Sequence, residues 1–233
     1  MKPIIAVSVA QLCFASGILG RTFTVRNNCP LTIWPAYFTN PDSPTQLTSQ
    51  AAGWEAPRDS QASFQVPDGW AGRFWGRRNC DFSRPGPTSC ATGGCNGGLV
   101  CDASTGSGVR DSGDSGRVKL NGEGEKDFYD ISNVDGYNLP VSISNNKECP
   151  APTCRPDLNP DCPDERMKVK DAEGVVIGCL SACQANLDGT HDDSANCCTG
   201  SHDRPDTCPP NGVQHYDYFK GLAAIFLYAT IFI

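Results

Sequence analysis

Cysteine is the residue that most constrains what this chain can fold into. The 233 residues contain 14 cysteines, a density typical of secreted proteins held together by disulfides. Zinc binding is the alternative explanation for so many cysteines. However, no C-x-x-C pair occurs, and the histidines, His191, His202 and His215, lack a paired ligand spacing. We therefore expect a disulfide framework with no metal and no cofactor.

The N-terminus has the features of a secretory signal. Lys2 precedes an apolar run that ends at small residues, near Gly17 or at Gly20. Removing residues 1–20 also removes Cys13 and leaves 13 cysteines. Because 13 is odd, at least one thiol must lack an intramolecular partner. The expected location is outside the cell.

Composition and charge narrow the class of protein further. Glycine (24) and proline (18) are abundant, which favours many turns and short strands over long helices. The net charge of −7 argues against nucleic acid as a partner, because phosphate backbones attract basic surfaces. A neutral or cationic ligand suits this surface better.

Alternating residues predict a β-rich first half. Residues 21–26 and 31–34 each alternate as a strand around Asn27-Asn28, which predicts an N-terminal hairpin. Another predicted strand covers 72–78. On that strand, Phe74 should face one side and its two neighbours the other, because successive side chains alternate across a strand.

Two carboxylates mark a predicted strand and the turn after it. Asp130 lies in a strand beginning at Phe128, and Asp135 precedes Gly136 in a turn signal. A straight strand would hold the two acids roughly 16 Å apart, so only the turn could bring them together. Such a pair can bind sugars or perform acid–base chemistry; the alternative is that both acids are solvated around an ordinary turn.

The chain changes character after Cys149. Cysteine, proline and aspartate dominate without any hydrophobic period, and Val175–Asn186 is the best helix candidate. In a helix, Cys179 and Cys183 would share one face at i and i+4.

Five segments in order resemble the thaumatin-like family, which includes thaumatin and osmotin. They are F-T-V-R-N-N-C-P-L-T-I-W, G-R-F-W-G-R-R-N-C, G-P-T-S-C-A-T-G-G-C-N-G-G-L-V-C, D-F-Y-D-I-S-N-V-D-G-Y-N-L-P and C-C-T-G-S-H-D-R-P-D-T-C-P-P. The similarity spans 21–220, and G-W-E-A-P together with V-P-D-G-W-A-G-R-F-W-G-R looks most like fungal members.

The resemblance implies a mainly β fold with a flattened β-sandwich core and a disulfide-rich domain of loops and short helices. The core would cover 21–153, with a disulfide loop region at 79–109, and the second domain 154–220. The implied pairs are Cys80–Cys90, Cys95–Cys101, Cys162–Cys179, Cys183–Cys197 and Cys198–Cys208. Cys29, Cys149 and Cys154 are then unpaired, because the family's partners for them lie beyond the matching region.

The family's cleft between these two parts is lined by one Arg, one Glu and three Asp. By resemblance, the Arg is Arg73 and two of the Asp are Asp130 and Asp135, which are the candidate catalytic residues. The Glu position holds Arg117, so Glu123 or Glu125 would have to replace it in substrate binding. The third Asp falls in the region where the similarity ends.

The last residues depart from the family. After Lys220 the similarity stops, and 221–233 is an uncharged hydrophobic tail, too short for a transmembrane helix of about 20 residues. One interpretation is a signal for a GPI anchor at the cell surface. The other is a truncated or alternatively spliced product that has replaced the family C-terminus.

The resemblance implies a secreted monomer that binds β-1,3-glucan in an acidic cleft, with an antifungal or wall-remodelling role. Weak endo-β-1,3-glucanase activity is left open. The alternative function is a non-catalytic hydrolase inhibitor or stress-response protein that uses the scaffold as a binding surface.

Overall fold

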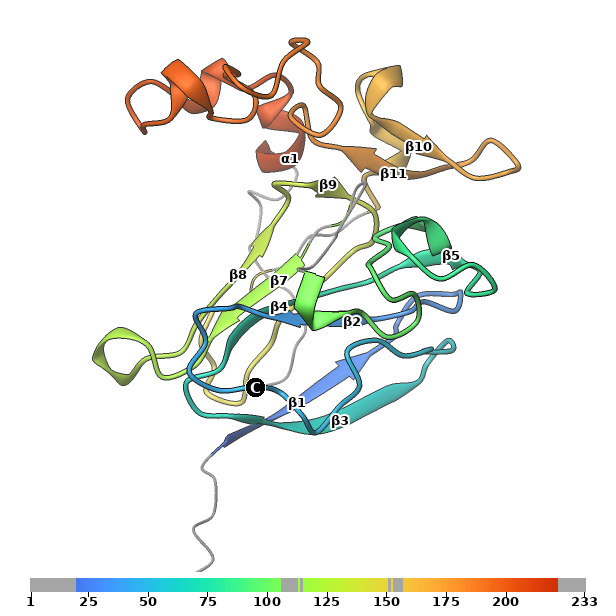
Figure 1. Ribbon diagram of the computed structural model, residues 1–233, viewed down its shortest axis with the longest axis vertical. Coiled ribbons are helices and arrows are strands. Elements are labelled where there is room, and N and C mark those ends of the chain that lie inside the picture. Colours follow the sequence, from blue (N-terminus) through green and yellow to red (C-terminus); the bar gives the residue numbers. More distant parts are fainter. Residues whose placement is uncertain (1–19, 106–112, 114, 151, 153–156, 222–233) are drawn as a thin grey trace, which may run out of the picture.

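The computed structural model describes residues 20–105, 113, 115–150, 152 and 157–221. Within them the fold is mainly β, with several antiparallel sheets and few helices, as predicted (Figure 1). Most of the signal expected at 1–20 and of the hydrophobic tail expected at 221–233 lies outside the described residues. Gly20 begins the first strand and Gly221 ends the α-helix.

Eleven strands and one short α-helix are defined in the described part of the chain. The strands are β1 (Gly20–Arg26), β2 (Ala36–Thr39), β3 (Gln61–Pro67), β4 (Ala71–Trp75), β5 (Arg78–Cys80), β6 (Cys90–Thr92), β7 (Ser115–Lys119), β8 (Phe128–Ser132), β9 (Gly136–Tyr137), β10 (Lys168–Lys170) and β11 (Val176–Leu180); the helix is α1 (Tyr216–Gly221).

Two sheets form the sandwich and enclose the main core. β1 pairs with β3, and the larger sheet has the order β2-β4-β7-β8. Phe23 and Phe64 on the first sheet meet Phe74 on the second, with ring centroids 5.8 and 6.0 Å from Phe74. Trp70 is fully buried beside them. Each buried aromatic side chain contributes strongly to the free energy of folding, because it removes about 150–250 Å² of surface from water.

The alternation predicted for β4 explains how this sheet acquires two different faces. Phe74 joins the core, whereas Trp75 packs in a separate cluster on the other side with the disulfide of Cys95 and Cys101. Arg73 shares the face of Trp75, and its guanidinium carbon lies 6.0 Å from the Trp75 ring centroid. The face of the sheet turned away from the core is therefore available for polar side chains.

The predicted N-terminal hairpin is wrong. β1 pairs in full register with β3, and Ile33 makes only an isolated bridge to Ala56. Asn27 explains the difference, because its buried side chain donates to the carbonyl oxygens of Leu31 and Ala56 and accepts from the Cys29 amide. These bonds hold 27–31 as a loop and turn the chain away from β1.

Residues 157–221 form a disulfide-rich layer over one end of the sandwich (Figure 1). Its small sheet, β10-β11-β9, includes one strand from the preceding part of the chain. The predicted helix at 175–186 is wrong at its start, because β11 occupies that stretch and Cys179 pairs with Tyr137. Consecutive β-branched residues lose side-chain freedom in a helix and favour a strand, which outweighs the i, i+4 spacing of the two cysteines.

All five implied pairs are disulfides in the structure: Cys80–Cys90, Cys95–Cys101, Cys162–Cys179, Cys183–Cys197 and Cys198–Cys208. Cys149 is an exposed free thiol, and Cys29 is half-buried. Cys154 lies outside the described residues. A search of the described helices finds none with the length and apolar character needed to cross a bilayer.

Candidate functional site

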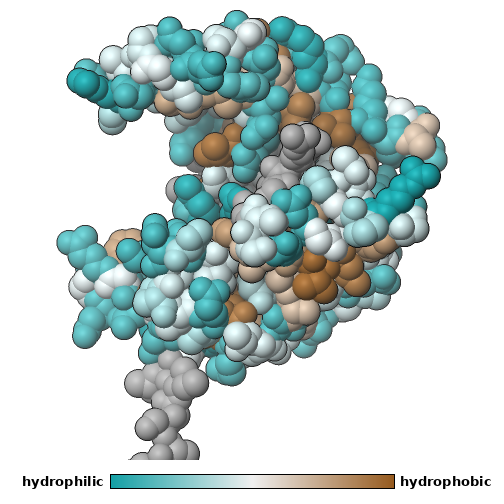
Figure 2. Space-filling view, viewed as in Figure 1, coloured by the Kyte–Doolittle hydropathy of each residue, from teal (hydrophilic) through white to brown (hydrophobic). Residues whose placement is uncertain are grey.

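The outer face of the larger sheet carries one row of functional side chains. Phe38, Arg73, Arg117 and Asp130 are direct partners on β2, β4, β7 and β8. Partners opposite each other project from the same face of a sheet, so these four form a cross-strand row. Figure 2 shows a deep hollow between the sandwich and the disulfide-rich layer.

Arg117 and Asp130 form a close ion pair within this row. Arg117 Nε donates to Oδ1 and Oδ2 of Asp130 at 3.1 and 3.0 Å, and Nη2 also contacts Oδ2. Both side chains remain about half exposed. The forked guanidinium therefore engages both carboxylate oxygens, the geometry in which arginine binds carboxylates most specifically.

Arg73 lies next to this pair but has fewer partners. Its Nη1 is 3.9 Å from Asp135 Oδ2, beyond hydrogen-bond distance, and its Nε is buried without a hydrogen-bond partner among the described residues. Burial lowers the pKa of Arg73, the charge of Asp135 raises it and the charge of Arg117 lowers it again. A partly buried guanidinium whose N–H groups lack partners can donate hydrogen bonds to a ligand.

Asp135 connects the sheet to the disulfide-rich layer. Gln184, in that layer, donates to Asp135 Oδ1 at 3.0 Å, so the carboxylate lies where the face of the sheet meets the layer above it. Gly136 is needed here because its φ is 124° and a Cβ would lie 2.3 Å from the Cys179 carbonyl oxygen. The tight turn thus brings Asp135 back toward Arg73.

A cavity of about 660 Å³ follows the cross-strand row. Phe38 is partly exposed along it, and Phe128, 48% exposed, lies near its other end. Arg117 and Lys119 add positive charge close to Asp130. The lining of this cavity therefore carries both positive and negative side chains, together with aromatic rings, rather than acidic residues alone.

The structure brings some of the sequence-predicted residues together and separates others. Arg73 and Asp135 are neighbours, and Asp130 is connected to them through Arg117. Glu123 and Glu125 are exposed on the short 3-10 turn η3 (Glu123–Glu125), beyond the last pair of β7 and β8.

The sequence analysis did not identify two residues of the site, Gln184 and Phe38. Gln184 is 49 residues from Asp135 in the sequence, and no local sequence pattern predicts a contact between them. Phe38 could have been predicted from the sequence. It is an aromatic residue on β2, the strand next to β4, and alternation places it on the face that points away from the core.

One group of side chains has the spacing of metal ligands. Atoms of Cys183, His191 and Cys197 lie within 4.8 Å of one another. The two cysteines are joined in a disulfide, so they offer no thiolate, the form of cysteine that binds metals. His191 Nε2 is also within 2.9 Å of the Cys183 carbonyl oxygen. With the disulfide closed, this group does not form a metal centre.

Comparison with known proteins decides the family. The model of the thaumatin family matches residues 27–224. This chain belongs to the thaumatin family. It is 35% identical over 212 residues to thaumatin-like protein 1 of Pyrus pyrifolia, covering 90% of this chain and 82% of that protein.

Two further relatives carry functional names. Pathogenesis-related protein 5 of Arabidopsis thaliana is 39% identical over 217 residues, covering 90% of this chain and 84% of the relative. A glucan endo-1,3-beta-glucosidase of Prunus avium is 36% identical over 218 residues, with coverage of 90% and 83%. These named relatives are plant proteins, so the expected likeness to fungal members is corrected to a likeness to plant thaumatin-like proteins.

Proposed function

We propose that this thaumatin-family protein is a secreted, monomeric defence protein that binds β-1,3-glucan along the cross-strand row without cleaving it. The family and the names of the relatives, a pathogenesis-related protein and a glucan endo-1,3-beta-glucosidase, support the choice of ligand and role. The observation that carries the proposal is the position of Arg73, which lines one cavity together with Phe38 and Phe128 and lies next to Asp135.

The row suits a neutral polysaccharide better than a charged ligand. Arg73 has unused donors and Asp135 has acceptor capacity, so together they can bond to neighbouring sugar hydroxyls. Phe38 and Phe128 can cover the apolar faces of the rings, because aromatic side chains combine a large contact area with stiff geometry. Arg73 and Arg117 are offset by Asp130 and the nearby Asp135. These four groups together therefore carry no net charge.

Hydrolysis does not suit this arrangement. Glycosidases of the common type need two carboxyl groups, about 5–5.5 Å or 6.5–9.5 Å apart, one to donate a proton and one to attack or to activate water. Both oxygens of Asp130 are engaged by Arg117. Of the two predicted catalytic carboxylates, Asp135 alone then remains, and a single carboxylate cannot fill both roles.

Retention on insoluble β-1,3-glucan tests the proposal. The wild-type protein should sediment with β-1,3-glucan and not with cellulose, and it should release no reducing sugar. Arg73→Ala and Asp135→Asn should each weaken binding about ten- to hundredfold, because each loses roughly one charge-assisted hydrogen bond of about 1.5–3 kcal/mol.

A control change at a distant arginine keeps this test specific. Arg58 is 66% exposed and pairs with its neighbour Asp59, so Arg58→Ala should leave glucan retention unchanged. Equal retention of wild type, Arg73→Ala and Asp135→Asn would contradict the proposed site. No retention of wild type would contradict the ligand and favour a role as an inhibitor surface.

A further inference from the structure

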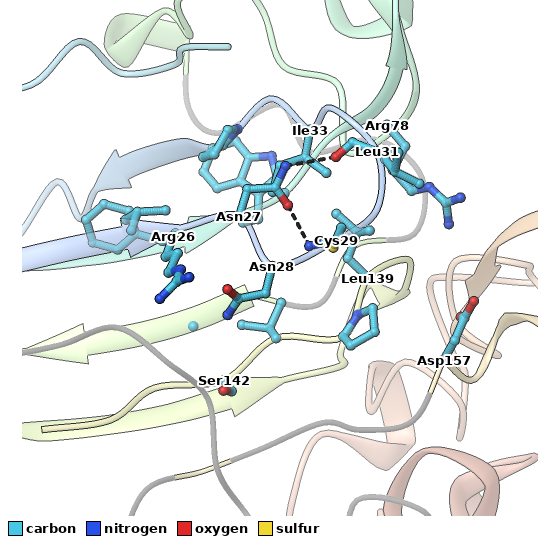
Figure 3. Close-up of a pocket in the computed structure, with 18 of the residues that line it drawn as sticks. Arg26, Asn27, Asn28, Cys29, Leu31, Ile33, Arg78, Leu139, Ser142 and Asp157 are labelled. Atoms are coloured by element: carbon cyan, nitrogen blue, oxygen red, sulfur yellow. Dashed lines mark hydrogen bonds between the residues drawn. The ribbon is translucent and has the colours of Figure 1, made fainter. Parts of the chain in front are cut away.

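The cysteines of this fold differ in their surroundings. Cys29 packs against an apolar cluster that contains Leu139, beside a cavity of about 720 Å³ whose described lining includes no histidine (Figure 3). The disulfide of Cys183 and Cys197 is different, because both cysteines are only half-buried and the ring of His191 lies beside them. This disulfide therefore combines accessible sulfur atoms with an imidazole.

Three possible ligand atoms meet at this disulfide. The Sγ atoms of Cys183 and Cys197 and a ring nitrogen of His191 all lie within 4.8 Å of one another. Around a tetrahedral ion with sulfur at about 2.3 Å and nitrogen at about 2.0–2.1 Å, neighbouring ligand atoms are about 3.6–3.8 Å apart. If the disulfide opens, shifts of about 1–2 Å bring the three atoms to that spacing.

The ring of His191 is held in an orientation that suits a metal ligand. Its Nε2 lies 2.9 Å from the Cys183 carbonyl oxygen. A carbonyl oxygen only accepts, so Nε2 carries the proton of the neutral ring, and the other ring nitrogen keeps the lone pair that a metal requires. Histidines that bind metals commonly donate their second nitrogen to a backbone carbonyl in this way.

Hydrogen bonds hold this turn together independently of the disulfide. The Thr199 hydroxyl donates to the His191 carbonyl oxygen at 2.6 Å, and the Cys197 amide donates to Ser194 Oγ at 3.1 Å. The Thr199 amide also donates to the Ser194 carbonyl oxygen at 3.1 Å. The turn at 191–199 should therefore keep its shape when the bond between the two sulfur atoms is broken.

The charge of the surroundings favours a cation. Residues 157–221 contain 12 Asp and Glu but 5 Lys and Arg, so the disulfide-rich layer is acidic. Asp188, Asp192 and Asp193 are exposed close to His191 in the sequence. Negative charge raises the local concentration of cations. Two thiolates and one imidazole are ligands that Zn²⁺ and similar ions prefer.

From these observations we propose that reduction of the disulfide turns Cys183, Cys197 and His191 into a binding site for Zn²⁺ or a similar divalent ion. A dithiol reductant supplies two electrons and two protons, which convert the disulfide into two thiols and the reductant into its own disulfide. The incoming ion displaces the two thiol protons and is bound by two thiolates and a neutral imidazole. Three protein ligands leave the fourth tetrahedral position to water. No ligand of this site belongs to the cross-strand row, so the inference does not rest on glucan binding.

Titration with Co²⁺ tests the proposal on the full secreted protein, because Co²⁺ bound tetrahedrally by thiolates absorbs visible light. Dithiothreitol is raised until mass spectrometry shows Cys183 and Cys197 reduced, and it is then removed without air. The reduced protein should gain this absorption and lose it to added Zn²⁺, whereas the unreduced protein should not gain it. His191→Ala should weaken Co²⁺ binding about tenfold or more, since loss of an outer-shell partner alone costs about that much. His215→Asn, at another exposed histidine of the layer, is the control that should change nothing.

Protection from alkylation keeps the test decisive if the histidine variants fold poorly. In the reduced wild type, Zn²⁺ should slow the reaction of iodoacetamide with Cys183 and Cys197 but not with Cys149, as mapped by mass spectrometry of the peptides. Protection of other cysteines in their place would overturn the proposal. Equal Co²⁺ affinity of His191→Ala and wild type, or no Co²⁺ uptake by protein in which Cys183 and Cys197 are reduced, would overturn it as well.

Discussion

Arg117 and Asp130 face each other across β7 and β8, and the guanidinium of Arg117 engages both carboxylate oxygens of Asp130. Arg73 is the register partner of Arg117 on its other side, so two arginines lie side by side on the sheet. Arginine stands at the position where the family resemblance implies glutamate. Because of this single difference Asp130 faces an arginine rather than a second carboxylate, and the difference underlies the proposed loss of hydrolysis.

Replacing Arg117 with glutamate should therefore add hydrolytic activity. Arg117→Glu frees Asp130 and places a second carboxylate opposite it, where side chains directly across a pair have Cβ atoms about 4.5–5.5 Å apart. Like charges at that distance favour protonation of one member, which supplies a proton donor. Reducing-end release from β-1,3-glucan should rise above the wild-type background for Arg117→Glu.

Arg117→Gln is the matched control for this prediction. It frees Asp130 without adding a carboxylate, so it should release no reducing ends. Its stability should fall by about 1 kcal/mol at most, because exposed ion pairs contribute little. Retained glucan binding with no reducing-end release by Arg117→Glu would show that the charge at this position does not control hydrolysis.

Arg77 should be the most sensitive arginine for stability. It is fully buried and donates to the carbonyl oxygens of Trp34, Gly98 and Leu99, and burial lowers its pKa to about 10. Each carbonyl left without a partner costs about 1–3 kcal/mol, so Arg77→Met should lower the free energy of unfolding by about 3–5 kcal/mol. Denaturant unfolding measures the loss.

Arg84→Met provides the comparison for Arg77, because Arg84 is exposed in the neighbouring loop. It should change the free energy of unfolding by less than about 0.5 kcal/mol. Arg77→Lys should recover only part of the stability, since an ammonium lacks the fork that reaches several carbonyls at once. Equal stability of Arg77→Met and wild type would mean that other donors replace the guanidinium.

These contacts show which parts of the fold the sequence could predict. The alternation around Phe74 placed it in the core and put Arg73 and Trp75 on the other face, because the period of a strand is a local property. The pairing of β1 with β3 was missed because it is decided by a partner some 40 residues away and by the buried side chain of Asn27.

The site was predictable only in part, because motifs identify residues but not the contacts between distant segments. Arg73, Asp130 and Asp135 were singled out from the family motifs, but the Arg117–Asp130 bond and the Gln184–Asp135 bond depend on how two layers meet. Glu123 and Glu125 were named as substitutes for the family's glutamate by sequence proximity. Their side chains instead occupy an exposed turn beyond the paired strands.

Acid should weaken the disulfide-rich layer through Asp164. The side chain of Arg166 and the Arg166 backbone amide hold the pKa of Asp164 at about 2, below its ordinary 3.8. A carboxyl group whose pKa falls on folding stabilises the fold above its unfolded pKa, and this contribution disappears as the pH drops through the folded value. The melting-temperature difference between wild type and Asp164→Asn should therefore be full above about pH 4 and vanish near pH 2.

Asparagine keeps the role of Asp164 as the cap of the short helical turn at 165–167, so this comparison isolates the charge. A constant offset between wild type and Asp164→Asn from about pH 4 down to about pH 2 would contradict the assignment.

The free thiol of Cys149 should react with a maleimide in the folded protein. Cys149 is exposed, and its Sγ lies 3.8 Å from the Lys147 carbonyl oxygen, whereas the ten disulfide cysteines have no thiol to offer. Mass spectrometry of the undenatured protein should show one rapid addition that is absent from Cys149→Ser. The same variant should lose any disulfide-linked dimer that the wild type forms on storage in air, because dissolved oxygen oxidises the exposed Cys149 thiols of two copies to one intermolecular disulfide. An unchanged labelling rate in Cys149→Ser would place the reactive thiol elsewhere in the chain.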